Sequence, residues 1–150
     1  LPVPAIIMLL AFAVSWFLLR KTPLGRKIYA VGGNEKVSFI AGIKIERVKI
    51  FVYAITGFFC ALAGAVLTSR LNSAQPTAGT GYELDAIAAV VLGGTSLSGG
   101  KGYITGTLVG VLIIGTLNNG LNILDVSSFY QQVVKGIVIL LAVLMDRKKA

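Results

Sequence analysis

Runs of apolar residues without a single charge restrict the possible folds of this chain more than any other feature. A helix needs about 20 predominantly apolar residues to cross a bilayer. Three of the runs reach or approach that length, and Ala86–Gly100 is shorter. A fifth segment, Val126–Met145, is interrupted only by Lys135. The four charge-free runs are Leu1–Leu19, Ile50–Ser69, Ala86–Gly100 and Tyr103–Leu124.

The composition agrees with a membrane protein. Charged residues make up 13% of the chain, against about 25% in an average soluble domain. Ile50–Leu67 is apolar on nearly every side, whereas a surface helix of a soluble protein has one polar face. We therefore expect an all-α, polytopic helical bundle with about five transmembrane or partial segments. The expected spans are 3–19, 50–69, 84–97 (short), 103–124 and 128–145.

The basic residues predict the orientation in the membrane. They gather in the connection 20–49 and at Arg147–Lys149, and the net charge is +8. Because cytoplasmic segments carry an excess of Lys and Arg, both regions are predicted to lie in the cytoplasm and loop 70–83 outside. No basic stripe is interleaved with stacking aromatic residues, so a nucleic-acid partner is not expected.

The short segment 84–97 has two possible courses. If it crosses the membrane, every basic cluster lies on the cytoplasmic side, as does the stretch Gly93–Gly102. If it enters and leaves on the outer side, Arg147–Lys149 would lie outside. We favour a crossing by a short helix with irregular backbone shielded by protein, and the short length keeps the re-entrant course open.

The stretch Gly93–Gly102, GGTSLSGGKG, resembles a phosphate-binding loop but does not match its pattern. The motif G-x-x-x-x-G-K-[ST] would need glycine at Thr95 and Ser or Thr at Gly102. ATP binding by this chain is therefore not expected. The chain has no histidine and a single cysteine, Cys60, within a span. We expect no catalytic residues, no metal site and no cofactor.

A few polar side chains lie inside the expected spans and are candidates for a substrate pathway. They can hydrogen-bond a hydroxyl group of a substrate or, equally, a neighbouring helix. Lys135 is costly at mid-membrane, so we expect it to snorkel or to face an aqueous path. The candidates are Asn118, Asn119, Asn122, Gln131 and Lys135.

Small residues recur every four positions in two of the spans. Gly102, Gly106 and Gly110 share one helix face, and Gly57 begins a similar series with Ala61 and Ala65. Such series allow close backbone approach. Packing within one bundle and a dimer face both remain open.

Two connecting segments have features beyond a plain link. In Gly32–Ile43, Asn34 is a plausible N-cap and Gly42 a plausible C′ residue around a short apolar helix. That helix suits a cytoplasmic partner's groove or the lipid surface. The outer loop Arg70–Asp85 suits the docking of a delivery protein, or serves as a connector only.

With these residues in view, the chain resembles the C-terminal half of a permease subunit of ATP-binding-cassette importers for sugars and branched-chain amino acids, of the ribose type. The resemblance covers essentially Lys21–Lys149. The matching stretches are KTPLGRKIYAVGGNEKVSFIAGI, RLNSAQPTAGTGYELD, AIAAVVLGGTSLSGGKG and LNNGLNILDVSSFYQQVVKGIVILLAVL.

The resemblance implies a permease homodimer in the cytoplasmic membrane of a bacterium, embedded in lipid, with a cytoplasmic C-terminus. A separate ATPase would bind ATP and magnesium, and an extracytoplasmic sugar-binding protein would deliver substrate. The chain itself would be no enzyme. An ion-driven or facilitative transporter and a membrane scaffold protein are the rival classes. Residues implied to couple to the ATPase are Gly93, Gly94, Thr95, Ser96, Ser98, Gly99, Gly100, Lys101, Gly32, Gly33, Asn34 and Glu35.

Overall fold

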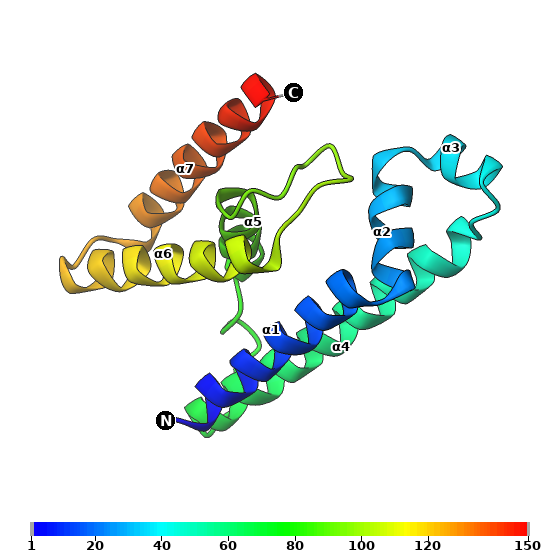
Figure 1. Cartoon of the computed structure of the whole chain (residues 1–150). Helices are drawn as coiled ribbons and strands as arrows, with labels where there is room; N and C mark the ends of the chain where they lie inside the picture. The colour runs from blue at the N-terminus through cyan, green and yellow to red at the C-terminus, as the bar shows by residue number, and fades with distance from the viewer. Residues whose placement is uncertain (1, 150) are drawn as a thin grey trace. The chain divides into compact units, whose positions relative to one another are not determined.

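The computed structural model describes residues 2–149, and within them every regular element is an α-helix (Figure 1). The chain divides into two compact units, Leu1–Ala78 and Gly79–Ala150, which are described separately below. Four of the described helices are long and apolar enough to cross a membrane. These observations confirm the predicted all-α membrane protein.

The first unit begins with the apolar helix α1 (Val3–Lys21), followed directly by α2 (Pro23–Gly33). Thr22 separates them, and its hydroxyl accepts a hydrogen bond from Gly25 N at 3.4 Å. Pro23 occupies the first helical position, where its missing N–H costs nothing. The connection 20–49 is therefore not an open loop: it holds α2, a second short helix and the beginning of α4.

The short helix α3 (Glu35–Ile40) has the caps that the sequence predicted. Asn34 Oδ1 accepts a hydrogen bond from Val37 N at 3.2 Å. Gly42 has a φ of +84° and closes the helix. Its N–H bonds Phe39 O at 3.0 Å, and Ile43 N bonds Ser38 O at 3.1 Å, which is the Schellman arrangement. Local signals thus fix this helix at both ends.

Helix α4 (Ile45–Leu71) begins five residues before the predicted span. Its 27 residues correspond to about 40 Å, longer than a bilayer core of about 30 Å. The extra turn carries Glu46, Arg47 and Lys49, and Lys49 Nζ lies 2.7 Å from Glu35 Oε1. Both side chains are about half exposed, so this pair adds little stability.

The second unit is built around the short helix α5 (Tyr82–Leu92), which packs on both α6 (Ile104–Ile123) and α7 (Ser128–Lys149). Its core consists of Ala88, Ala89 and Ile114, which are at most 3% exposed, with Val111, Val138 and Ile139 around them. Eleven residues give a helix of about 16 Å, too short to span the hydrocarbon core.

The predicted segment 84–97 contains a short helix followed by irregular backbone, as expected, and the helix itself has other ends. Helix α5 begins at Tyr82, inside the predicted outer loop, because Gly81 with a φ of +87° turns the chain there. It ends at Leu92 because Gly94 adopts a φ of +95° and completes a Schellman motif. Residues 93–97 therefore belong to the following loop.

Glycines let α5 and α6 approach at backbone distance. A Cβ on Gly106 would collide with Gly93 O, and a Cβ on Gly110 would collide with Ala89 O. This confirms packing within one bundle for these two glycines. Gly102 faces the Thr95 side chain instead, and a Cβ on Gly57 would have no atom within 4 Å.

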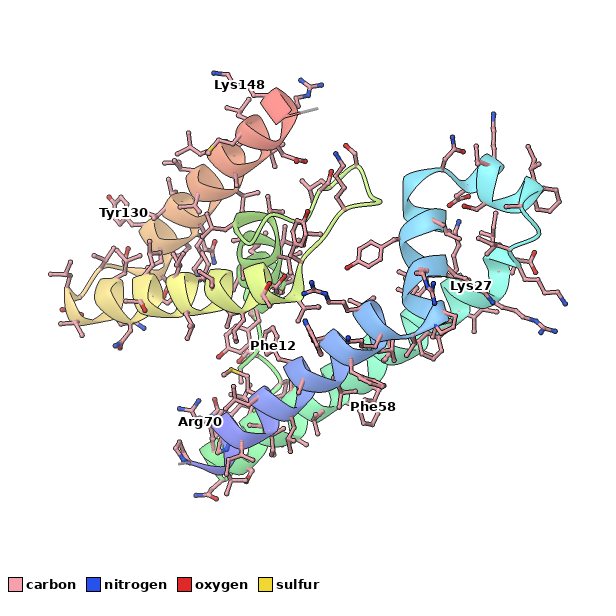
Figure 2. The ribbon with its side chains drawn as sticks, in the orientation of Figure 1. Phe12, Lys27, Phe58, Arg70, Tyr130 and Lys148 are labelled. Carbon is pink, nitrogen blue, oxygen red and sulfur yellow. The ribbon has the colours of Figure 1, made fainter. Side chains whose placement is uncertain are left out.

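Many large apolar side chains project outward from the long helices. Phe58 on α4 is 63% exposed and Tyr130 on α7 is 69% exposed (Figure 2). Since apolar side chains on a transmembrane helix contact lipid or further protein, this exposure is expected for helices of this kind.

Candidate functional site

Three helices of the second unit bring one charged or polar side chain each to a common point, here called the polar cluster: Asp85, Asn118 and Lys135. Asp85 lies on α5, Asn118 on α6 and Lys135 on α7. Lys135 Nζ is 2.7 Å from Asp85 Oδ1, and their side chains are 12% and 21% exposed. Asn118 Nδ2 donates to Asp85 Oδ2 at 3.2 Å. One carboxylate therefore joins α5 to both of its neighbours.

The polar cluster is electrically neutral. A lysine inside a membrane span is costly unless it is paired, and Asp85 supplies the opposite charge at hydrogen-bond distance. Lys135 thus reaches a partner inside the unit. Asn118 Oδ1 is buried and has no hydrogen-bond partner among the described residues.

Sequence reasoning missed Asp85, because this residue lies where the predicted outer loop Arg70–Asp85 meets the predicted segment 84–97 and was not among the polar candidates within spans. The structure places Asp85 within α5, paired with Lys135. The available signal was Lys135 itself, since an ionisable residue inside a membrane calls for a named partner of opposite charge. Asp85, Asp125 and Asp146 each adjoin an apolar run, so this signal did not single out Asp85.

The remaining candidate amides form a second, smaller group. Gln131 Nε2 donates to Asn122 Oδ1 and to Val126 O, each at 2.9 Å. These bonds tie the end of α6 to the start of α7, so these two residues contact neighbouring protein. Asn119 is exposed on α6 and does not join the polar cluster through any bond that the structure shows.

The glycine loop, Gly93–Gly102, is held by its own backbone. Thr95 N bonds Val90 O at 3.2 Å, Ser96 N bonds Lys101 O at 3.0 Å, and Gly99 N bonds Ser96 O at 3.2 Å. Gly99 and Gly100 have φ angles of +89° and +78°, which favour glycine. A phosphate-binding loop must offer free N–H groups, and several N–H groups of this loop already bond within it.

The glycine loop is also tied to the end of α7. Ser96 Oγ lies 3.1 Å from Asp146 Oδ2 and donates to it. Ser98 and Lys101 are exposed, whereas Thr95 and Ser96 are half-buried. Asp146 was missed in the sequence, where nothing in its local pattern relates it to a serine 50 residues earlier.

The other predicted coupling residues lie in the first unit. Gly32 and Gly33 form the exposed end of α2, and Asn34 caps both α2 and α3. Glu35 pairs with Lys49. These residues form the joint between two short helices, and their interactions are accounted for by local structure.

Four helices in the described part of the chain are long and apolar enough to cross a membrane, and a short helix packs on two of them and is joined to one by an ion pair. This arrangement defines a multi-pass membrane protein and is typical of transporters. More specifically, the chain belongs to the family described as branched-chain amino acid transport system / permease component, whose model matches residues 2–143.

Curated relatives are highly similar. The chain is 73% identical to the ribose import permease protein RbsC of Bacillus subtilis, over 100% of this chain and 47% of the relative. It is 62% identical to the RbsC protein of Escherichia coli K12, over 99% of this chain and 46% of the relative. Identity to the E. coli xylose transport system permease protein XylH is 46%, over 97% and 37%. The chain therefore spans less than half the length of each of these relatives. No solved structure matches it.

Proposed function

We propose that this chain is part of the permease subunit of an ATP-binding-cassette importer that carries a monosaccharide, ribose, across the cytoplasmic membrane of a bacterium. The observation that carries the proposal is the 73% and 62% identity to two relatives named ribose import permeases. The 46% identity to a xylose permease favours ribose over xylose.

The proposed assembly contains two permease subunits, a cytoplasmic ATPase and an extracytoplasmic sugar-binding protein. ATP and magnesium would be bound by the ATPase, so this chain would perform no chemical step. Membership of a transport-system permease family supports this division of labour. The internal hydrogen bonds of the glycine loop also support this assignment of ATP to the partner, because they use backbone N–H groups that a phosphate would need.

We propose that the glycine loop lies on the cytoplasmic side, where it would contact the ATPase. The hydrogen bond between Ser96 and Asp146 brings the loop to the end of α7 that carries Arg147 and Lys148. A basic end is expected in the cytoplasm. Helix α6 runs back along α5, with Gly106 against Gly93 and Gly110 against Ala89. This antiparallel packing favours a segment 84–97 that crosses the membrane and disfavours a re-entrant one.

An ion-driven transporter is the main rival, and the polar cluster bears on it. Such a transporter needs an intramembrane carboxylate that can exchange a proton or bind a cation. Asp85 is the carboxylate that contacts two of the membrane-length helices, but Lys135 and Asn118 contact its two oxygens. The carboxylate is thus already neutralised by the chain itself, which favours the ATP-driven mechanism.

The proposal predicts a specific partner. Detergent extraction of the permease from bacterial membranes is expected to bring down an ATPase whose hydrolysis rate rises severalfold when ribose-loaded binding protein is added. The unloaded binding protein is the control. A permease that purifies without any ATPase, or with one that ignores loaded binding protein, would contradict the proposed function.

A further inference from the structure

Helix α5 is fastened to α7 at two points by polar side chains. Near the start of α5, Asp85 pairs with Lys135 at 2.7 Å. Beyond its end, Ser96 Oγ donates to Asp146 Oδ2 at 3.1 Å. Both contacts involve a carboxylate, and hydrogen bonds to charged groups are the stronger kind.

The two contacts have the same spacing on both segments. Asp85 and Ser96 are eleven residues apart, and so are Lys135 and Asp146. Between Lys135 and Asp146, eleven residues of α7 extend about 16 Å. The stretch from Asp85 to Ser96 combines most of α5 with the start of the glycine loop. The segments therefore run in the same direction. Val138 and Ile139, which pack against the core of Ala88, Ala89 and Ile114, lie between Lys135 and Asp146 along α7.

A helix of this length does not hold its position alone. Isolated helices shorter than about 12 residues are marginal in water, and their place in a protein depends on packing. Towards α6, the contacts are close and apolar: Ala88 and Ala89 pack with Ile114, and the carbonyls of Ala89 and Gly93 lie against Gly110 and Gly106. Three polar contacts add direction to this packing. Lys135 and Asp146 on α7 contact Asp85 and Ser96, and the side-chain amide of Asn118 on α6 donates a hydrogen bond to Asp85.

The glycine loop is suited to receive a push and pass it on. Ser96 N bonds Lys101 O, so the residues between them form a closed ring with exposed Leu97, Ser98 and Gly99 at its tip. Ser96 Oγ also accepts a hydrogen bond from Ser98 N at 3.2 Å. A displacement of the tip therefore reaches Ser96, and through it Asp146.

We propose that the contacts Asp85–Lys135 and Ser96–Asp146 hold α5 and the glycine loop against α7. A displacement of the loop by the ATPase then moves α5 and α7 together as one rigid body. Asp85 and Asp146 are then positioning residues for transport. This inference rests on the proposed function, because it assumes that the ATPase pushes on the loop.

The test measures how many sugar molecules enter per ATP hydrolysed, in proteoliposomes containing permease, ATPase and binding protein. Ser96→Ala and Asp146→Ala are each expected to lower this ratio about three- to tenfold. The double variant should be no worse than either single one, because both remove the same bond. Asp146→Asn keeps an acceptor oxygen and should restore much of the ratio.

Ser127→Ala is the matched control, since Ser127 is an exposed serine in the turn between α6 and α7. A purely structural role would lower uptake and hydrolysis together and leave their ratio unchanged. An unchanged ratio in Ser96→Ala and Asp146→Ala would overturn the inference. No ATP-dependent uptake by the parent protein would instead count against the proposed function.

A second measurement does not depend on transport. In Asp146→Ala, the loop amides at Ser96, Ser98 and Gly99 should exchange with deuterium faster, while amides in the middle of α6 should not change. Unchanged deuterium exchange in the loop would show that the Ser96–Asp146 contact does not hold the loop, whatever the transport assay shows.

Discussion

Replacing Gly106 with alanine is expected to destabilise the protein by about 1–3 kcal/mol, the usual cost of overpacking a well-packed contact. The added Cβ would collide with the carbonyl oxygen of Gly93, so α5 and α6 must separate. The free energy of unfolding, measured by titrating micelle-bound protein with a denaturing detergent, checks this expectation. Uptake should fall as well, because α5 carries the glycine loop.

Gly115→Ala is the matched control for Gly106→Ala. Gly115 lies on the same helix, and a Cβ there would meet no atom within 4 Å. In an open helical position, alanine is favoured over glycine by about 0.5–1 kcal/mol. The two alanines should therefore change stability in opposite directions. Equal effects would show that α5 and α6 do not touch at Gly106.

Removing the charge of Lys135 is expected to have the largest effect on stability. Lys135→Met leaves Asp85 as an unpaired carboxylate that is 21% exposed. Breaking a fully buried pair in this way costs about 3–5 kcal/mol, and this partly buried pair should lose up to that amount. The same detergent titration measures the loss, and Asp85→Leu alone should be similarly harmful because it leaves the lysine unpaired.

The double variant Asp85→Leu/Lys135→Met separates the pair from its two members. It removes both charges, so most of the lost stability should return, to within about 1 kcal/mol of the parent protein. The coupling energy from the four proteins then measures the contact itself. Additive losses would contradict the ion pair between α5 and α7.

The fold class could be predicted because charge-free runs of membrane length allow few alternatives. Local caps could also be predicted: Asn34 and Gly42 bound α3 as expected. Helix α2 was missed although Thr22 and Pro23 are an N-cap and a first-turn proline. Its two terminal glycines and basic residues suggested a loop. The start of α4 was missed because the predicted span was limited to the charge-free run, whereas the helix also includes the charged residues before it.

The contacts of the polar cluster could be predicted only in part. Asn118 and Lys135 were identified as polar residues within spans, and the structure brings them together through Asp85. Asp85 was not identified as their partner, because pairing between helices depends on how the helices are rotated and how deep each lies. The same applies to Asp146. A sequence shows which side chains need partners but not which helices will supply them.

The most direct test of this account asks on which side of the membrane the glycine loop lies. Single cysteines replace Ser98 in the loop and Ser127 between α6 and α7, both exposed, after Cys60 is changed to alanine. A membrane-impermeant maleimide should label the cysteine at 127 in intact spheroplasts and the cysteine at 98 only in inverted vesicles. Labelling at 98 from the outside would place the loop away from any cytoplasmic ATPase and contradict the account.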